Sequence, residues 1–175
     1  VVTAQKREQN LQNVPIAISA IGAEKLEQFQ IKDARDLSGL APNLTITPPA
    51  TNNTAAVISI RGIPSGATET FGIDLANATY VDGVYIARSS AAGMDVMDIE
   101  RVEVLRGPQG TLFGRNTTGG AISFVSRKPS EEFRVSAQAG YGNFNAWNGK
   151  ITVDSGELFG GLKTSFGYAH GQRDG

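Results

Sequence analysis

Four carboxylates in the middle of the chain form its densest group of residues suited to acid–base chemistry or metal binding. They are Asp95, Asp98, Glu100 and Glu103, all within nine residues. Paired carboxylates can serve as general acid and general base, and clusters of carboxylate oxygens can bind calcium. This spacing fits no EF-hand loop, and a solvated face of a short helix is the favoured interpretation.

Composition restricts the other chemistry that the chain could perform. The 175 residues include no cysteine, which excludes disulfides and thiolate metal sites, and a single histidine, His170. A HExxH zinc helix needs two histidines, and a Ser/His/Asp triad could draw on only this one histidine. With 16 Lys and Arg against 17 Asp and Glu, the net charge of −1 argues against a broad phosphate-binding surface. We therefore expect no enzyme, no metal, no cofactor and no nucleic-acid partner.

Five of the 21 glycines gather within fourteen residues, at Gly107, Gly110, Gly114, Gly119 and Gly120. A phosphate-binding P-loop is excluded by the spacing, because only three residues separate Gly110 from Gly114 and no Lys-Ser/Thr pair follows. Glycine permits positive φ and close approach of backbone segments. The cluster therefore indicates tight turns between closely packed strands.

The elements that must position these residues divide the chain near residues 128–130. Before this point, the pattern predicts short strands over 14–21, 57–62, 80–86, 102–105 and 121–125, with short helices over 24–29 and 33–40 and one helical turn over 95–100. Asp82-Gly83 is a turn or bulge candidate inside one of these strands. This mixture indicates a small α+β domain.

From Phe133 onward the pattern changes to alternation of apolar and polar residues. Three runs of about 9–12 residues are separated by residues 142–145 and 155–161, and aromatic residues stand near their ends. Strands of this length with one apolar face are typical of a transmembrane β-barrel wall. An antiparallel sheet in a soluble sandwich would produce the same alternation.

The glycine cluster belongs to a longer pattern with a family resemblance. The run RVEVLRGPQGTLFG at 101–114, with TGGAI at 118–122 and SRKP at 126–129, resembles the closing motif of the plug domain of TonB-dependent outer-membrane receptors. Four further stretches agree: IRGI at 60–63 and YVDGV at 80–84 resemble plug strands, NVPI at 13–16 resembles the plug opening, and VVTA at 1–4 resembles the end of the TonB box. Together they cover most of residues 1–128 in the family's order.

The resemblance implies an organisation in three parts. Residues 1–4 would be a remnant of the TonB box, residues 5–130 an α+β plug domain with a small mixed sheet and short helices, and residues 131–175 the first three antiparallel strands of an outer-membrane β-barrel. The barrel, of roughly 22 strands in such receptors, is expected to be incomplete in this chain, which begins on Val1 rather than Met as an interior segment would.

The resemblance also implies a function, which is TonB-dependent import of a scarce nutrient across the outer membrane of a Gram-negative bacterium. Ferric siderophore is the first substrate candidate, and carbohydrate or cobalamin are alternatives. The implied partners are TonB with its inner-membrane energising complex, outer-membrane lipid and the small nutrient. A secreted soluble substrate-binding module is the competing interpretation of the same sequence.

Site residues follow from the same resemblance. A flexible strand for TonB is expected at Val1, Val2, Thr3 and Ala4, and ion pairs with the barrel wall are expected at Arg61 and Arg106. Exposed polar interruptions of the plug, over 64–77 and 87–95, supply the expected substrate contacts. They are Ser65, Thr68, Glu69, Phe71, Asp74, Arg88 and Ser89.

Overall fold

The computed structural model describes residues 2–3, 9–31, 34–48, 56–65, 75–87 and 98–174. They form two compact units, Val1–Ser126 and Arg127–Gly175. The first unit is mixed α+β and the second is an antiparallel sheet, which confirms the predicted fold class.

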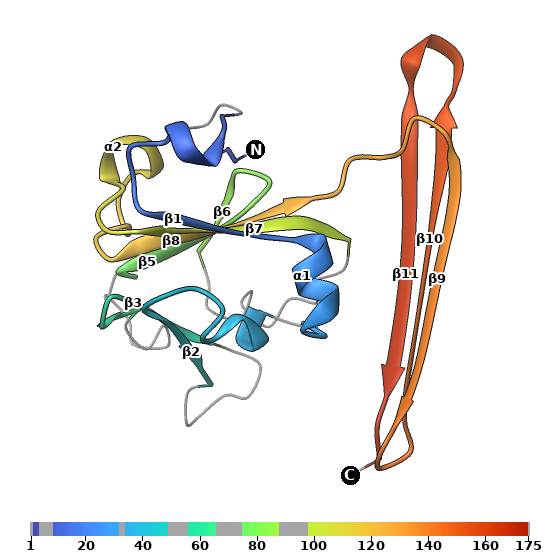
Figure 1. Cartoon of the computed structure of the whole chain (residues 1–175), viewed down its shortest axis with the longest axis horizontal. Helices are drawn as coiled ribbons and strands as arrows, with labels where there is room; N and C mark the ends of the chain where they lie inside the picture. Colours follow the sequence, from blue (N-terminus) through green and yellow to red (C-terminus); the bar gives the residue numbers. More distant parts are fainter. Residues whose placement is uncertain are drawn as a thin grey trace. The chain divides into compact units, whose positions relative to one another are not determined.

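The first unit is built on a five-stranded sheet in the order β1-β7-β8-β5-β6 (Figure 1). Its strands are β1 (Ile18–Gly22), β5 (Asn77–Val81), β6 (Val84–Ile86), β7 (Ile99–Arg106) and β8 (Gly120–Ser126). All neighbours are antiparallel except β5 and β8, which run parallel. The sheet therefore joins segments that lie far apart in the sequence, and Ile18 pairs with Leu105.

A second, three-stranded sheet in the order β2-β3-β4 accompanies the first. It consists of β2 (Leu44–Thr47), β3 (Val57–Ile60) and β4 (Ile63–Pro64). Arg61 and Gly62 make the turn between β3 and β4, with φ of 55° and 77°. Among the residues that the structure describes, the helices of the unit are α1 (Ala23–Gln28), α2 (Gly110–Phe113) and two 3-10 turns, Leu11–Asn13 and Ala34–Leu37.

Alternation along β7 gives the main sheet one hydrophobic core on each face. Val102 and Val104 lie in the first core, with residues of α1, of the 3-10 turn Ala34–Leu37 and of the small sheet. Leu105 lies in the second core, with Val2, Val14, Ala78, Tyr80 and Ala121. Both faces of this sheet are therefore covered by other parts of the unit.

Most of the expected elements are present, with three differences. The helix over 24–29 is confirmed as α1, and Asp82-Gly83 is the turn between β5 and β6. The predicted helical turn over 95–100 is wrong at its described end, because Ile99 and Glu100 belong to β7. In the predicted helix over 33–40, only Ala34–Leu37 is helical, as a 3-10 turn. The strand over 14–21 begins only at Ile18.

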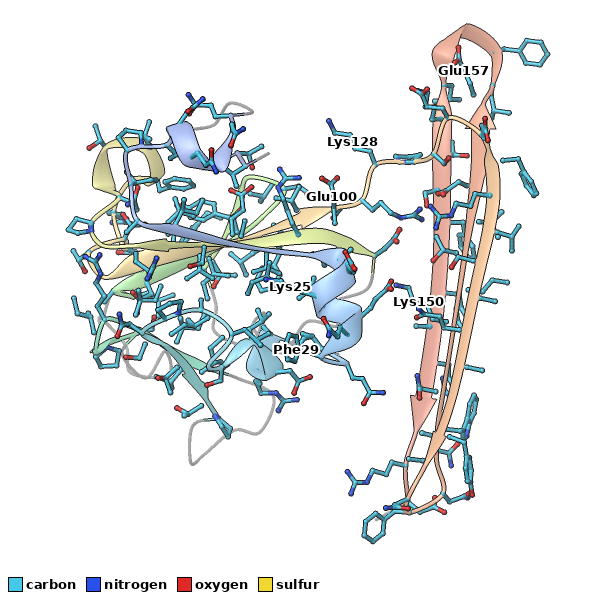
Figure 2. The ribbon with its side chains drawn as sticks, viewed as in Figure 1. Lys25, Phe29, Glu100, Lys128, Lys150 and Glu157 are labelled. Carbon is cyan, nitrogen blue, oxygen red and sulfur yellow. The ribbon has the colours of Figure 1, made fainter. Side chains whose placement is uncertain are left out.

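The second unit is one antiparallel sheet of three long strands in the order β11-β10-β9. They are β9 (Phe133–Gly142), β10 (Ala146–Glu157) and β11 (Lys163–Gln172), with a 3-10 turn at Phe159–Gly161. The alternating pattern is confirmed, since the pairing places apolar side chains on one face and Lys150 with other polar side chains on the opposite face (Figure 2). Phe133, Tyr141, Trp147, Phe166 and Tyr168 are exposed on the apolar face.

Candidate functional site

The beginning of the chain is folded onto the first unit. Val2 is 1% exposed in the second core. Its N–H donates to the Gln9 carbonyl at 2.8 Å, and the Gln9 N–H donates back to the Val2 carbonyl at 2.9 Å. The main-chain groups of Val2 are thus already paired within the chain.

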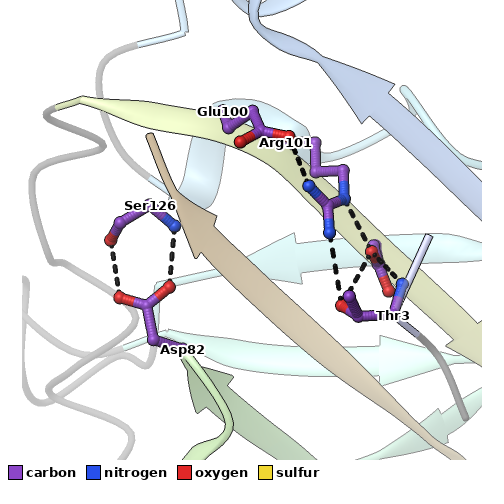
Figure 3. Close-up of polar contacts among 6 residues, drawn as sticks. Thr3, Asp82, Glu100, Arg101 and Ser126 are labelled. Carbon is purple, nitrogen blue, oxygen red and sulfur yellow. Dashed lines mark hydrogen bonds and ion pairs between the residues drawn. The ribbon is translucent and has the colours of Figure 1, made fainter. Parts of the chain in front are cut away.

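Thr3 is held by a buried carboxylate from the middle of β7. Its N–H donates to Oε1 of Glu103 at 2.7 Å, and its hydroxyl donates to the same oxygen at 3.1 Å. Arg101 Nε donates to this oxygen at 2.8 Å, and Arg101 Nη1 pairs with Glu100 (Figure 3). We call the set of Thr3, Arg101 and Glu103 the N-terminal clasp.

The clasp changes two sequence expectations. The sequence predicts that Val2 and Thr3 lie in a flexible strand, but the burial of Val2 and five hydrogen bonds fix these two residues to the unit. Glu103 was expected on a solvated helix face with the other carboxylates, yet it is 1% exposed on a strand. Val1, Ala4 and Asp95 lie outside the described residues.

One signal in the sequence could have identified Glu103. It stands in the otherwise apolar stretch Val102–Leu105, and every other residue of a central strand shares a face. A carboxylate at such a position is buried and needs partners. Its actual partner Thr3 is 100 residues away in sequence, so no local pattern could have named it.

Arg61 and Arg106 are the two arginines that the sequence predicts to pair with the barrel wall. A Cβ added at Gly107 would lie 3.1 Å from Arg61 Nη1, so the guanidinium of Arg61 lies directly against the residue that follows Arg106. Among the described residues neither arginine forms an ion pair, and Nε of Arg106 is buried without a hydrogen-bond partner. Arginines that lack a counter-charge among the described residues fit a site completed by carboxylates from elsewhere.

Ser65 lies near the start of residues 64–77, the first segment predicted to contact substrate. Ser65 is 4% exposed, its N–H donates to the Ile58 carbonyl at 2.7 Å, and its hydroxyl donates to the Asn77 carbonyl. The expectation that Ser65 is exposed for substrate is therefore wrong, because the backbone satisfies its hydroxyl. Thr68, Glu69, Phe71, Asp74, Arg88 and Ser89, the other expected substrate contacts, lie outside the described residues.

Asn77, at the start of β5, connects the two sheets of the first unit. Its side-chain amide donates to the Ile58 carbonyl at 2.9 Å and to the Ile63 carbonyl at 2.7 Å. Its Oδ1 is buried without a partner and lies against Gly119, where an added Cβ would clash with it. An added Cβ at Gly120 would clash with the Leu105 carbonyl. Close packing thus explains two glycines of the cluster.

The end of the first unit and the start of the second are each fixed by a carboxylate. Asp82 accepts from the N–H and the hydroxyl of Ser126, the last residue of β8, at 2.8 and 2.7 Å (Figure 3). Within the second unit, Arg127 donates to Asp154 at 3.1 Å, and Asp154 is 1% exposed in β10. The consecutive residues Ser126 and Arg127 are therefore each held by a carboxylate of their own unit.

The described residues offer no group of three His, Asp or Glu side chains arranged to hold a metal ion. Over the same part of the chain, no helix is long and apolar enough to cross a membrane. His170 packs against Trp147, with ring centroids 5.0 Å apart, near the end of the three-stranded sheet.

Comparison with known proteins places this arrangement in a class. The sequence model described as "TonB-dependent Receptor Plug Domain" matches residues 10–121, which is more than half of the chain. The chain therefore belongs to the TonB-dependent receptor plug domain family. The resemblance noted from the motifs is confirmed.

Individual relatives agree with the family. The chain is 33% identical over 150 residues to the iron-regulated outer membrane virulence protein of Vibrio cholerae, covering 79% of the chain and 21% of that protein. It is 28% identical over 184 residues to the vitamin B12 transporter BtuB of Vibrio vulnificus, covering all of the chain and 28% of the transporter. The chain thus spans roughly a quarter of the length of these relatives.

Solved structures share the fold. The ferric yersiniabactin uptake receptor FyuA of Yersinia pestis superposes with a TM-score of 0.77 and 28% identity, over 88% of this chain and 24% of the receptor. A ferric pyoverdine complex of FpvA of Pseudomonas aeruginosa gives a TM-score of 0.81 at 22% identity, over 98% of this chain and 22% of the receptor. These homologues are outer-membrane receptors of Gram-negative bacteria.

Proposed function

We propose that this chain is the plug and the first three barrel strands of an importer that carries a scarce nutrient across the outer membrane. Residues 1–4 act as the end of the TonB box, residues 5–130 as the plug, and residues 131–175 as the start of the barrel wall. The observation that carries the proposal is the match of residues 10–121 to the plug family, followed by strands with one apolar face. That apolar face contacts outer-membrane lipid.

Ferric siderophore is the substrate that we favour. Two of the similar proteins are named as a ferric yersiniabactin uptake receptor and a catecholate siderophore receptor. Cobalamin is the second candidate, because the vitamin B12 transporter BtuB matches the chain over its whole length. Carbohydrate is the third, since the hydroxyl and charged side chains of the two polar segments suit hydrogen bonding to a sugar. We assign these contacts to Thr68, Glu69, Phe71, Asp74, Arg88 and Ser89.

TonB supplies the energy in this proposal, together with its inner-membrane complex. Residues Val1, Val2, Thr3 and Ala4 add as an extended strand to TonB, so that main-chain hydrogen bonds provide the affinity. Arg61 and Arg106 pair with carboxylates of the barrel wall and hold the plug in place. The Arg61 guanidinium lies beside Gly107, which follows Arg106, and neither arginine has a counter-charge among the described residues; both observations support this role.

The test is a proline at Val2 in the full-length receptor. Proline removes the N–H and fixes φ, so Val2→Pro should abolish uptake of a labelled ferric siderophore in cells while surface binding of the siderophore persists. Val2→Ala keeps the N–H and serves as the matched control, which should retain most uptake. Uptake by Val2→Pro equal to that of Val2→Ala would contradict the assignment of residues 1–4.

The competing secreted module makes a different prediction. In that protein the apolar face of β9–β11 would be buried against protein, and the full gene product would be recovered in soluble form. Fractionation of cells that express the full-length gene distinguishes the two, since the proposed importer is expected in the outer-membrane fraction.

A further inference from the structure

A short irregular segment connects the two units of the chain. Ser126 ends β8 and Phe133 begins β9, and residues 127–130 form neither helix nor strand. Arg127 and Lys128 make this segment basic; the Arg127 side chain is 25% exposed, and Lys128 is exposed (Figure 2). Because the chain has no cysteine, no disulfide joins the units. One broken peptide bond in this segment would therefore leave no covalent link between them.

The side chain of Arg127 is bound by a buried carboxylate of β10. Nη1 donates to Oδ2 of Asp154 at 3.1 Å, and Nη2 donates to Oδ1 at 3.4 Å, so each oxygen accepts from one nitrogen. Asp154 is 1% exposed, and its cross-strand neighbours are Arg134 of β9 and Ser165 of β11. A carboxylate buried this deeply needs charged or hydrogen-bonding partners, and the planar guanidinium group supplies two parallel bonds. We call the pair of Arg127 and Asp154 the junction latch.

The junction latch uses the chemistry by which trypsin-like proteases recognise their substrates. These enzymes bind the arginine or lysine that precedes the cleaved bond in a pocket that carries a carboxylate. The guanidinium of Arg127 cannot occupy that pocket while it is bound to Asp154, so the two carboxylates compete for one group. The next bond, Lys128–Pro129, is a poor alternative, because proline makes it a tertiary amide without an N–H. Within residues 127–132, the Arg127–Lys128 bond is therefore the one that such a protease would cleave.

The far end of the segment is held by separate contacts. The Glu157 N–H donates to the Glu131 carbonyl at 3.0 Å, and Lys163 Nζ pairs with the Glu131 carboxylate at 2.9 Å. A Cβ added at Gly156 would lie 2.8 Å from the backbone nitrogen of Phe133, so the chain passes closely by β10 there. Opening of the junction latch can therefore expose the start of the segment while β9 stays paired with β10.

We propose that Asp154 is a positioning residue that keeps the Arg127 side chain out of the binding pocket of trypsin-like proteases, which makes the Arg127–Lys128 bond a latent cleavage site at the junction of the two units. Hydrolysis adds one water across this bond and leaves a carboxylate on Arg127 and an amine on Lys128. The site is a property of this chain alone. That the cut would detach a plug from a barrel wall rests on the function proposed above.

Limited digestion with trypsin tests the proposal in the full-length receptor, purified in detergent. Mass spectrometry of timed samples gives the rate at which chains ending at Arg127 appear, and a synthetic peptide of residues 123–132 gives the rate for the same bond without the latch. The ratio of the peptide rate to the receptor rate is the protection of the bond, which reports how rarely the latch opens. Asp154→Asn keeps the shape but loses the charge that strengthens both bonds, and we expect protection to fall about tenfold.

Two matched variants separate the junction latch from general effects. Glu131→Gln removes a negative charge from the same segment but leaves the Arg127–Asp154 pair in place, so protection should change less than about twofold. Asp154→Glu keeps the charge and changes the shape, and it should retain more protection than Asp154→Asn. The reverse order would mean that Asp154 acts through packing alone and would contradict the proposal.

The bond after Arg134, inside β9, shows whether the sheet itself has opened, and it should stay uncut in every variant that folds. If Asp154→Asn unfolds the sheet, Arg127→Lys decides the question. Lysine remains a trypsin site but is a point charge without the fork of two nitrogens that matches both carboxylate oxygens. Measured against a peptide that carries the same lysine, its protection should be about threefold lower than that of the natural receptor.

Three further results would overturn the inference. They are a natural receptor that is cut as fast as the peptide, equal protection in folded Asp154→Asn and Glu131→Gln receptors, and unchanged protection in Arg127→Lys. The digestion needs neither siderophore nor TonB. Failure of the junction latch would therefore leave the proposed importer standing, and failure of siderophore uptake would leave the latch standing.

Discussion

Asn77 should be the most informative position for testing how the two sheets of the plug are joined. Its amide donates to carbonyls of both β3 and β4 and is fixed in orientation by these two acceptors. Asn77→Ala removes both donors, and Asn77→Asp keeps the shape while replacing the donating nitrogen by an oxygen. The two variants therefore separate the loss of hydrogen bonds from the introduction of repulsion.

The expected magnitudes differ. Two neutral hydrogen bonds contribute about 1 kcal/mol each, and removal of the unpartnered Oδ1 recovers about 1 kcal/mol, so Asn77→Ala should lower the free energy of unfolding by about 1–2 kcal/mol. Asn77→Asp faces both carbonyls with an acceptor at a position that is 1% exposed. An ionised carboxylate there is uncompensated and should cost roughly 3–5 kcal/mol.

Urea unfolding of residues 1–126, followed by far-ultraviolet circular dichroism, measures both values. This unit has its own sheet and two hydrophobic cores, and slopes of roughly 1–3 kcal/mol per molar urea are usual for small domains. At about 2 kcal/mol per molar, Asn77→Asp should lower the midpoint by roughly 2 M and Asn77→Ala by less than about 1 M. Asn13→Asp makes the same chemical change at an exposed residue and should leave the midpoint unchanged.

Equal destabilisation by the two Asn77 variants would refute this reasoning. It would mean that the amide nitrogen does not donate to Ile58 and Ile63 in solution, and that the contact between the sheets depends on packing alone.

Three further outcomes are expected. In the full-length receptor, Arg106→Ala should loosen the plug, because loss of one partner of a buried pair costs roughly 3–5 kcal/mol; the readout is ion leak in planar bilayers, and wild-type conductance would count against the pairing. Burial, and then the neighbouring Tyr85, raises the pKa of Tyr80 above its usual 10.0. The contribution of Tyr80 to the stability of residues 1–126 should therefore be fully present below about pH 10 and be lost as pH rises through the folded pKa. Tyr80→Phe should flatten this alkaline decline in urea midpoints. Without membranes, residues 1–175 should self-associate in light scattering through the exposed face of Phe133, Tyr141 and Phe166, whereas residues 1–126 stay monomeric; a monomeric 1–175 would favour the secreted module.

Local patterns predicted the strand unit well. Each of its strands is at least ten residues long, so the period of two is repeated often enough to set both the element and its faces. The turn at Asp82-Gly83 was also predictable, since both residues tolerate positive φ and lie between two apolar runs.

Local sequence patterns could not predict which strands far apart in the chain pair with each other. β1 pairs with β7, which follows it 79 to 87 residues later in the chain, from Gly22↔Arg101 to Ile18↔Leu105, and no local pattern chooses that partner. Ser65 shows the same limit on a smaller scale, because a polar residue in a polar segment is expected outside, yet the Asn77 carbonyl accepts its hydroxyl inside. In both cases tertiary contacts override what composition suggests.

In the main sheet, the strand at which the chain enters and the strand from which it leaves resist pulling to different extents. The chain enters at β1, an edge strand bonded only to β7, so separation of β1 opens a single strand pair. It leaves from β8, which is bonded to β7 on one side and to β5 on the other and is capped by Asp82. Tension on the first residues would therefore separate β1 from β7 at the edge of the sheet. β8 would keep its pairing with both neighbours and would continue to connect the domain to the strands that follow.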